Sequence, residues 1–289
     1  MPDRRDAIET DVLVVGAGPG GSAAAYHLAR HGLDVTVLER SSFPREKVCG
    51  DGLTPRSVRA LLRMGIDTTD PGFARVVGLR VYSRRTMIEL PWPKLRDFPD
   101  YGLVRTRADL DALLAGRARA AGARVLERTE AVSPILEDGW VRGVLARPAD
   151  ERGAEPFPVR ARMVLAADGA PSKLAAQAGV VRDETRPLGI AARRYYRIPR
   201  DPGPWFESWL DLREGEVILP GYGWLFPLPD GTVNLGAGLL NTFRGFREVS
   251  AQRLFAAFAS MLPPEWGVGE ETEERRVGKE CRSRWSPYH

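Results

Sequence analysis

A thiol and a carboxyl lie close together in the short stretch Cys49-Gly50-Asp51-Gly52. Such a thiol could be a catalytic nucleophile, a metal ligand or a small side chain that fills the core. The chain holds two cysteines, Cys49 and Cys281, three histidines and no C-x-x-C pair. These counts exclude a disulfide framework and predict that no metal is bound. No histidine is near Cys49 in the sequence, which weakens the case for a thiolate nucleophile.

A second group of residues has the spacing of a dinucleotide-binding turn. Gly16, Gly18 and Gly21 satisfy the pattern G-x-G-x-x-G. The first glycine permits a tight turn, the second lets a pyrophosphate approach the backbone, and the third lets a helix pack closely on a strand. The N–H groups at the start of that helix would then face the phosphates. Glu39 ends the next strand and can accept hydrogen bonds from ribose hydroxyls, so the sequence favours FAD or NAD over NADP.

A strand, a turn, a helix and a second strand must hold this glycine motif in place. Apolar runs predict strands at residues 11–15 and 34–38, with a helix from about residue 20 to residue 31 between them. Continuous apolar strands joined by a helix are typical of a parallel sheet covered on both faces. We therefore predict an α/β fold with a Rossmann-like domain. The alternative, a glycine-rich turn without a ligand, does not require this order of elements.

Later segments predict further elements of this domain. Thr54 has the residue type expected at the start of a helix, and Thr106 with Asp109 has capping-box spacing before another helix. Residues 137–139, Glu-Asp-Gly, predict a turn between two strands. Residues 159–168 predict a further buried strand that ends at an Asp-Gly pair.

The character of the chain changes after about residue 185. Extended, aromatic-rich segments follow, with a hairpin turn predicted at residues 229–231 and an amphipathic helix predicted at residues 251–261. These features predict an antiparallel sheet in an interposed second domain.

Three aromatic residues alternate along one of these segments. Tyr222, Trp224 and Phe226 would share one face of a strand. Such a face can be part of the core, or it can line an apolar cavity that holds a ligand. Both have the same composition, so the sequence leaves the two alternatives open.

Composition limits the partners of the chain. Its net charge is +4, from 42 basic and 38 acidic residues, which is a mixed surface and argues against nucleic-acid binding. No apolar run is long enough to span a bilayer, and the N-terminus does not have the apolar core of a signal peptide. We expect a cytoplasmic protein, and a peripheral contact with the inner face of a membrane stays open.

Together these motifs resemble the geranylgeranyl reductase family of FAD-dependent oxidoreductases, built on the fold of p-hydroxybenzoate hydroxylase. The resemblance rests on "VVGAGPGGSAAAYHLA", "VLERSSFPREKVCGDGLTPR", Arg107 with "ADLDALL", "ADGAPS" and "PGYGWLFP". One residue, Gly221, separates Pro220 from Tyr222 where many members have two. The combination "CGDGLTPR" and "LPGYGWLFP" looks most like the bacterial branch that reduces the isoprenoid tail of menaquinone.

The resemblance implies a set of cofactor contacts. By this resemblance the residues that contact FAD are Gly16, Gly18, Pro19, Gly20, Gly21, Glu39, Arg40, Cys49, Gly50, Arg107, Val132 and Asp168. An arginine such as Arg107 suits a pyrophosphate because its guanidinium donates two bonds at fixed geometry. The stretch from Cys49 would lie over the isoalloxazine, where glycines permit close approach to a flat ring.

The family's reaction is reduction of an isoprenoid double bond. The implied substrate is a prenylated lipid or quinone, with Tyr222, Trp224 and Phe226 lining its tunnel. Hydride transfer from the reduced flavin needs a proton for the second carbon, and Cys49, Asp51 and Tyr222 are the candidate catalytic residues. The sequence does not identify the external electron donor. A flavin-dependent monooxygenase or halogenase of the same fold is the alternative.

The predicted domains are discontinuous. Residues 1–75 and 101–184 would form the FAD-binding domain, and residues 76–100 and 185–262 the substrate domain. The family's second glycine-aspartate motif, a GDAAG-like turn, does not occur in the sequence. We therefore expect a C-terminally truncated chain whose last segment, residues 263–289, is not native. An inactive truncated fragment is a further alternative to an active enzyme.

Overall fold

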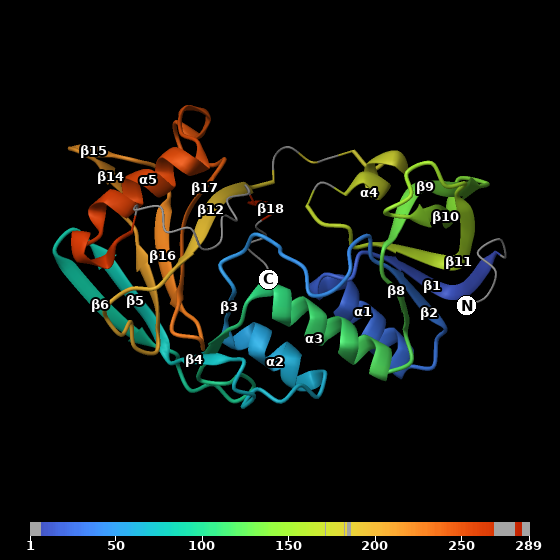
Figure 1. Cartoon of the computed structure of the whole chain (residues 1–289), viewed down its shortest axis with the longest axis horizontal. Coiled ribbons are helices and arrows are strands. Elements are labelled where there is room, and N and C mark those ends of the chain that lie inside the picture. Colours follow the sequence, from blue (N-terminus) through green and yellow to red (C-terminus); the bar gives the residue numbers. More distant parts are fainter. Residues whose placement is uncertain (1–6, 171, 182, 184–185, 269–280, 285–289) are drawn as a thin grey trace. The chain divides into compact units, whose positions relative to one another are not determined.

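The computed structural model describes residues 7–170, 172–181, 183, 186–268 and 281–284 (Figure 1). The chain divides into two compact units. The first comprises Met1–Glu46 and Ala108–Asp183, and the second comprises Lys47–Arg107 and Glu184–His289. Residues 47–75, predicted as part of the FAD-binding domain, therefore lie in the second unit. Most of the predicted non-native tail, residues 269–280 and 285–289, lies outside the described residues.

A six-stranded sheet with the order β8-β2-β1-β11-β10-β9 forms the first unit. Its strands are β1 (Ile8–Val15), β2 (Val35–Leu38), β8 (Arg124–Leu126), β9 (Thr129–Glu137), β10 (Trp140–Pro148) and β11 (Phe157–Ala166). Its helices are α1 (Pro19–Arg30), α3 (Arg107–Ala120) and α4 (Lys173–Gln177). Strands β8, β2, β1 and β11 pair in parallel, and β9 and β10 pair antiparallel. The predicted α/β order of strand, turn, helix and strand is confirmed.

The first unit also shows where sequence patterns succeed and fail. Asp138 and Gly139 both have positive φ, 51° and 78°, between β9 and β10, which confirms the predicted turn. The prediction that residues 159–168 form a buried strand is only partly confirmed, because Met163 is 58% exposed. Only part of β11 packs into the core, where Val159 and Ala161 contact the cluster around Leu13 and Leu38.

The second unit contains a seven-stranded sheet with the order β18-β12-β17-β16-β13-β5-β6. Its strands are β5 (Gly78–Ser83), β6 (Thr86–Pro91), β12 (Leu188–Tyr196), β13 (Trp205–Trp209), β16 (Tyr222–Pro227), β17 (Val233–Leu240) and β18 (Cys281–Arg284). All neighbours pair antiparallel except β13 and β5, which are parallel. The predicted antiparallel sheet is confirmed apart from this one junction.

Smaller elements complete this unit. A three-stranded sheet has the order β3-β7-β4, a hairpin joins β14 to β15, and a helix, α2, follows β3. Their bounds are β3 (Gly52–Leu53), α2 (Pro55–Arg63), β4 (Ala74–Val76), β7 (Gly102–Val104), β14 (Arg213–Glu214) and β15 (Val217–Ile218). Thr54 is the N-cap residue of α2, as predicted. No helix in the described part of the chain is long and apolar enough to cross a membrane.

Helix α5 (Ala251–Met261) covers one face of the large sheet (Figure 1). Its bounds match the predicted amphipathic helix, and Ser250 caps it by accepting a hydrogen bond from the Arg253 N–H at 3.1 Å. Phe258 lies directly over Gly223, where an added Cβ would be 2.7 Å from the ring. The absence of a side chain at Gly223 therefore lets the helix pack closely on β16.

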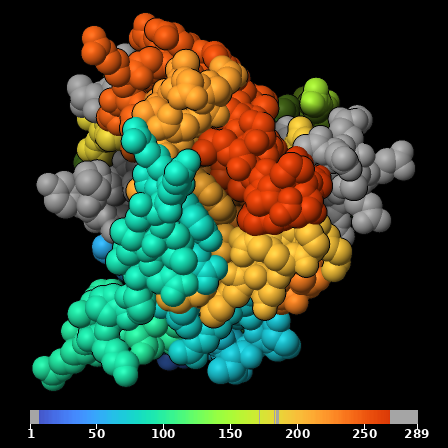
Figure 2. Space-filling view, turned by 90° about the vertical axis from the view of Figure 1, so that its left-hand side faces the viewer, coloured from blue at the N-terminus to red at the C-terminus, as the bar shows by residue number. Residues whose placement is uncertain are grey.

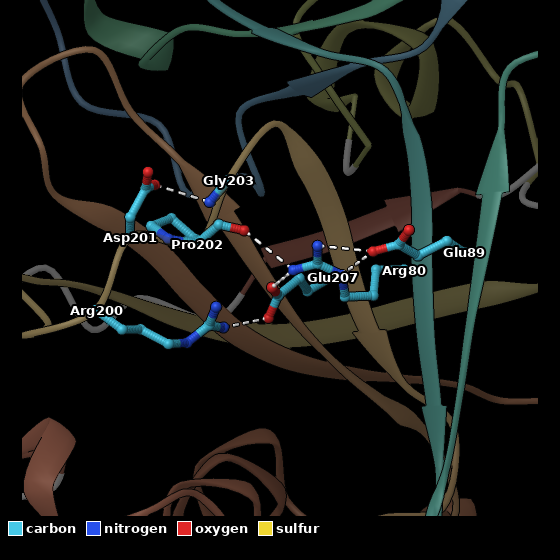
Figure 3. A network of polar contacts seen from close by, with 7 residues as sticks. All are labelled: Arg80, Glu89, Arg200, Asp201, Pro202, Gly203 and Glu207. Carbon is cyan, nitrogen blue, oxygen red and sulfur yellow. Dashed lines mark hydrogen bonds and ion pairs between the residues drawn. The ribbon is translucent and has the colours of Figure 1, made fainter.

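Ion pairs stabilise the parallel junction between β5 and β13 (Figure 3). Glu207, whose side chain is 0% exposed, accepts a hydrogen bond from Arg80 Nη1 at 2.8 Å and another from Arg200 Nη2. Arg80 also bonds Glu89 on β6 at 2.8 Å and the carbonyl of Pro202 at 3.2 Å. Two arginines thus compensate one buried carboxylate, and the network joins three strands.

Candidate functional site

Backbone sterics determine the shape of the glycine turn in the first unit. Gly16 has φ +100°, and a Cβ there would lie 2.4 Å from the carbonyl oxygen of Ala167. A Cβ on Gly21 would lie 1.9 Å from the carbonyl oxygen of Gly16, whereas a Cβ on Gly20 would meet nothing within 4 Å. Gly16 and Gly21 are therefore required by close contacts, and Gly20 borders open space.

The start of α1 suits an anion. Its N-cap residue is Gly18, which offers no side-chain cap, and its first turn carries no acidic residue. The first N–H groups of a helix have no partner within the helix, and they carry partial positive charge. This arrangement fits the pyrophosphate of a dinucleotide.

Glu39 is more firmly held than the sequence indicates. Its carboxylate is buried and accepts hydrogen bonds from the N–H groups of Ala17 at 3.1 Å and Ser41 at 3.0 Å. Arg45 bonds the same carboxylate at 3.2 Å and also pairs with the buried Asp111 at 3.0 Å. Sequence reasoning did not single out Arg45 or Asp111. Glu39 thus braces the glycine turn, and a carboxylate retains further acceptor sites for a ribose.

The other predicted residues of the first unit are spread over several of its elements. Pro19 is the first residue of α1, and Arg40 is exposed directly after Glu39. Val132 is half-buried on β9. Asp168 follows β11 and accepts a hydrogen bond from the Leu174 N–H, in α4, at 3.3 Å.

The remaining predicted residues belong to the second unit, in which the Asp51 carboxylate accepts three hydrogen bonds. Its Oδ2 accepts hydrogen bonds from the Tyr195 hydroxyl at 2.6 Å and from Asn234 Nδ2 at 2.7 Å. Its Oδ1 accepts a hydrogen bond from the backbone N–H of Arg107 at 3.1 Å. Burial raises the pKa of this carboxyl above its usual 3.8, although these donors and the charge of Arg193 act in the opposite direction.

Gly50 and Gly52 lie against aromatic rings of the same unit. A Cβ on Gly50 would lie 3.1 Å from the ring of Phe226 and 3.4 Å from the indole nitrogen of Trp224. A Cβ on Gly52 would lie 3.0 Å from Phe226 and 3.1 Å from Phe206. Close approach to an isoalloxazine was the predicted reason for these glycines. In the structure, the flat rings that they approach are those of Phe206, Trp224 and Phe226.

The aromatic strand has the predicted alternation. The ring centroids of Tyr222 and Trp224 are 5.7 Å apart, and those of Trp224 and Phe226 are 6.3 Å apart, so the three share one face of β16. Trp224 is 4% exposed, and a Cβ on Gly236 would lie 2.1 Å from its ring. Trp224 is thus packed as a core residue, whereas Tyr222 and Phe226 are half-buried. A substrate role for all three stays a prediction.

Asn234 and Tyr195 were missed by sequence reasoning, although both bind Asp51. The signal for Asn234 was present, because an asparagine interrupts the apolar strand "VNLGAGLL" and a buried amide needs partners. Among the described residues, no group of three histidine, cysteine, aspartate or glutamate side chains could hold a metal ion.

The glycine turn, the uncapped start of α1 and the acid after β2 define a dinucleotide-binding site in the first unit. Residues 9–218 match the FAD binding domain family, and the chain belongs to that family. The structure is similar to that of a geranylgeranyl bacteriochlorophyll reductase-like protein from Thermoplasma acidophilum, with a TM-score of 0.74 and 27% identity. That match covers 97% of this chain and 66% of the other.

In sequence, the chain is 40% identical over 258 residues to the menaquinone reductase of Mycobacterium tuberculosis. It is 33% identical over 240 residues to the digeranylgeranylglycerophospholipid reductase of Methanosarcina acetivorans. These matches cover 89% and 81% of this chain, but 62% and 56% of the relatives. The chain therefore spans less than two thirds of the length of these reductases.

Proposed function

We propose that the chain is the FAD-dependent part of a reductase that saturates isoprenoid double bonds. The double bonds are those in the tail of menaquinone or a related polyprenyl lipid. The observation that carries this proposal is the 40% identity over 258 residues to a menaquinone reductase. The uncapped start of α1 and the glycine turn support the cofactor assignment independently.

The residues of the first unit would hold the ADP part of the cofactor. Gly18 and Gly20 leave the start of α1 accessible to the pyrophosphate, and Glu39 would accept hydrogen bonds from the ribose. FAD, when bound and reduced, supplies the hydride for the double bond. Arg40, Arg107, Val132 and Asp168 are proposed as further contacts on the resemblance alone.

Saturation of a double bond also needs a proton, for which Cys49, Asp51 and Tyr222 are the candidates. Asp51 is 2% exposed, and both of its carboxyl oxygens already accept hydrogen bonds. Cys49 and Tyr222 are partly exposed and therefore better able to reach a substrate. We therefore propose that Asp51 holds the loop in place through its hydrogen bonds. Cys49 and Tyr222 are the proposed proton donors.

We also propose that the second unit contacts a membrane through an edge surface made of residues 83–97. The side chains of Met87, Ile88 and Leu90 on the edge strand β6 are 49%, 52% and 49% exposed, and that of Leu95 is 55% exposed. Exposed basic residues flank them, namely Arg84, Arg85, Lys94 and Arg96. Figure 2 shows this segment, in teal, on the surface that faces the viewer.

Apolar side chains flanked by basic residues are typical of contact with an anionic lipid surface. The name of the Methanosarcina acetivorans relative contains a phospholipid, which supports contact with a lipid surface. Such a contact agrees with a protein on the cytoplasmic side of a membrane.

The alternative is halogenation or oxygenation on the same fold. The chondrochloren halogenase CndH matches with a TM-score of 0.75 but 21% identity, which shows the fold alone. The test is to incubate the purified chain anaerobically with reduced FAD and a menaquinone, to reoxidise the quinone ring of the product in air, and to measure the masses of the product and of its tail fragment by mass spectrometry. We expect a gain of two hydrogens in the isoprenoid tail. A product that gains oxygen in air, or halogen when halide is added, would overturn the proposal, and bound flavin without any product would indicate a fragment that lacks turnover.

A further inference from the structure

We propose that Asn234 is a positioning residue that fixes the Cys49-Gly50-Asp51 loop to the aromatic strand β16. Its side chain is 0% exposed and makes three hydrogen bonds. Nδ2 donates to the carbonyl oxygen of Cys49 at 2.9 Å and to Asp51 Oδ2 at 2.7 Å. Oδ1 accepts a hydrogen bond from the indole N–H of Trp224 at 2.9 Å.

Only a carboxamide provides this combination of two donors and an acceptor. The Asn234 amide has one orientation that satisfies its partners, because the reverse orientation would place its oxygen against the carbonyl of Cys49 and the carboxyl of Asp51. It would also turn its NH₂ group toward the N–H of Trp224. An aspartate has no amide donor, and an aliphatic side chain would remove the hydrogen bonds of Asn234 to the Cys49 carbonyl and the Trp224 N–H and leave Asp51 Oδ2 with the Tyr195 hydroxyl.

The strands on both sides of β17 also contribute residues that contact the Cys49-Gly50-Asp51 loop. Tyr195 on β12 is paired with Asn234 on β17, and both donate to the same oxygen, Oδ2 of Asp51. On the other neighbour, β16, Phe226 is paired with Asn234 and lies under Gly50 and Gly52. One row of three cross-strand neighbours therefore supports the loop.

The backbone of the loop needs this support. Asp51 has φ 64°, a conformation that costs free energy for a residue other than glycine and persists where surrounding contacts determine it. The contact with Asn234 joins positions 183 residues apart in the chain, so no local turn can replace it. We infer that Asn234, through the carbonyl of Cys49, determines where the Cys49 thiol is held.

The role in reduction rests on the proposed function, but the positioning itself does not, because it can be measured without FAD or substrate. The probe is the rate of Cys49 alkylation by iodoacetamide in a Cys281→Ser background. Asn241→Ala is the matched control: Asn241 follows the same strand β17, and its Oδ1 accepts a hydrogen bond from the Leu188 N–H at 2.7 Å.

We expect Asn234→Ala to raise the native-state alkylation rate at least about tenfold, since two hydrogen bonds to the loop are lost. We expect Asn241→Ala to leave the rate within about twofold. The temperature of each measurement is set the same number of degrees below the melting midpoint of the variant, so that global unfolding contributes equally. Equal rates in the two variants would overturn the proposal.

A charge swap provides a second measurement. Asn234→Asp places an acceptor beside the Asp51 carboxyl and should loosen the loop more than Asn234→Ala. Adding Asp51→Asn to Asn234→Asp restores one hydrogen bond from an amide to a carboxylate between positions 51 and 234. The double variant should therefore recover part of the wild-type protection of Cys49 against alkylation. A double variant that is alkylated as fast as Asn234→Asp alone would contradict a direct contact and favour general destabilisation.

Discussion

Arg80 Nη1 and Glu207 Oε1 form an ion pair at 2.8 Å across the one parallel junction of the second unit's large sheet. The pair joins an early hairpin, β5 and β6, to strands that come from the last third of the chain. Since the Glu207 side chain is 0% exposed, its two arginine partners provide most of the compensation for its burial.

Glu207→Gln should destabilise the second unit strongly. The change leaves Arg80 and Arg200 facing each other without their carboxylate, and removing one member of a buried pair typically costs about 3–5 kcal/mol. The Arg80 and Arg200 side chains are 17% and 28% exposed, so we expect about 3 kcal/mol. Urea unfolding measures this free energy.

Glu89→Gln is the matched control for that experiment. Glu89 bonds the same arginine, but its side chain is 40% exposed, so we expect a loss of about 0–1 kcal/mol. Similar losses for the two substitutions would show that burial of Glu207 does not determine the strength of the network.

Gly21→Ala should abolish FAD retention and destabilise the first unit. Its Cβ would lie 1.9 Å from the carbonyl oxygen of Gly16, so the glycine turn must open. The adjacent Gly20→Ala meets nothing within 4 Å and should leave the fold intact. Visible absorbance after gel filtration reports the bound flavin for both variants. Retention of FAD by Gly21→Ala would contradict the assignment of this turn.

Gly236→Ala tests the packing of Trp224. The added methyl would lie 2.1 Å from the indole ring, and overpacking of this kind typically costs about 1–3 kcal/mol. Gly153→Ala, at an exposed site with nothing within 4 Å, should change stability by less than about 0.5 kcal/mol. Urea midpoints and the emission spectra of the tryptophans measure both effects. An unchanged midpoint for Gly236→Ala would show that the ring can move aside at little cost.

Asp51 should make stability decrease as pH rises in the acid range. Because burial raises its pKa in the folded state above 3.8, the folded chain binds this proton more tightly than the unfolded chain. Its contribution is therefore most favourable below pH 3.8, decreases as pH rises through the raised pKa, and is constant above it. Asp51→Asn removes this dependence.

The measurement is the free energy of unfolding of wild type and Asp51→Asn from pH 3.5 to 7. We expect the wild type to lose stability relative to the variant as pH rises over the lower part of this range. If the wild type instead gained stability relative to Asp51→Asn as pH rises, the three hydrogen-bond donors would outweigh burial in their effect on the pKa of Asp51.

Ile88→Ser combined with Leu90→Ser should weaken binding to vesicles of phosphatidylglycerol and phosphatidylcholine by about tenfold. Removing two exposed apolar side chains from a lipid contact loses about 1–2 kcal/mol. Leu136→Ser is the matched control, because Leu136 is 55% exposed in the first unit and is not flanked by the basic cluster. Vesicle co-sedimentation provides the measurement.

The charge of the edge surface has its own readout. Arg84→Gln with Arg85→Gln should weaken binding to the anionic vesicles and reduce its dependence on salt. Equal binding to neutral vesicles would contradict the proposal, as would a chain that dimerises through β6 in solution and does not bind vesicles.

Local patterns predicted the elements of this protein better than its buried polar contacts. The amphipathic spacing of residues 251–261 and the Asp138-Gly139 turn depend on neighbours in sequence, and both were found as predicted. The bonds of Glu207 to Arg80 and of Asn234 to Asp51 could not be predicted, because these partners lie 127 and 183 residues away in the chain. The exposure of Met163 was missed for a related reason, since an apolar strand pattern does not say which face is covered.

The parallel junction also determines the order in which this chain can fold during synthesis. Arg80 leaves the ribosome 127 residues before Glu207, which corresponds to a wait on the order of ten seconds at typical elongation rates. All segments of the first unit have been synthesised by Asp183, before β13 exists. The nascent chain should therefore complete its first unit while the β5–β6 hairpin is still without its neighbour, so arrest of translation after Asp183 but before Trp205 has left the ribosome would yield a protease-resistant first unit and a cleavable second one.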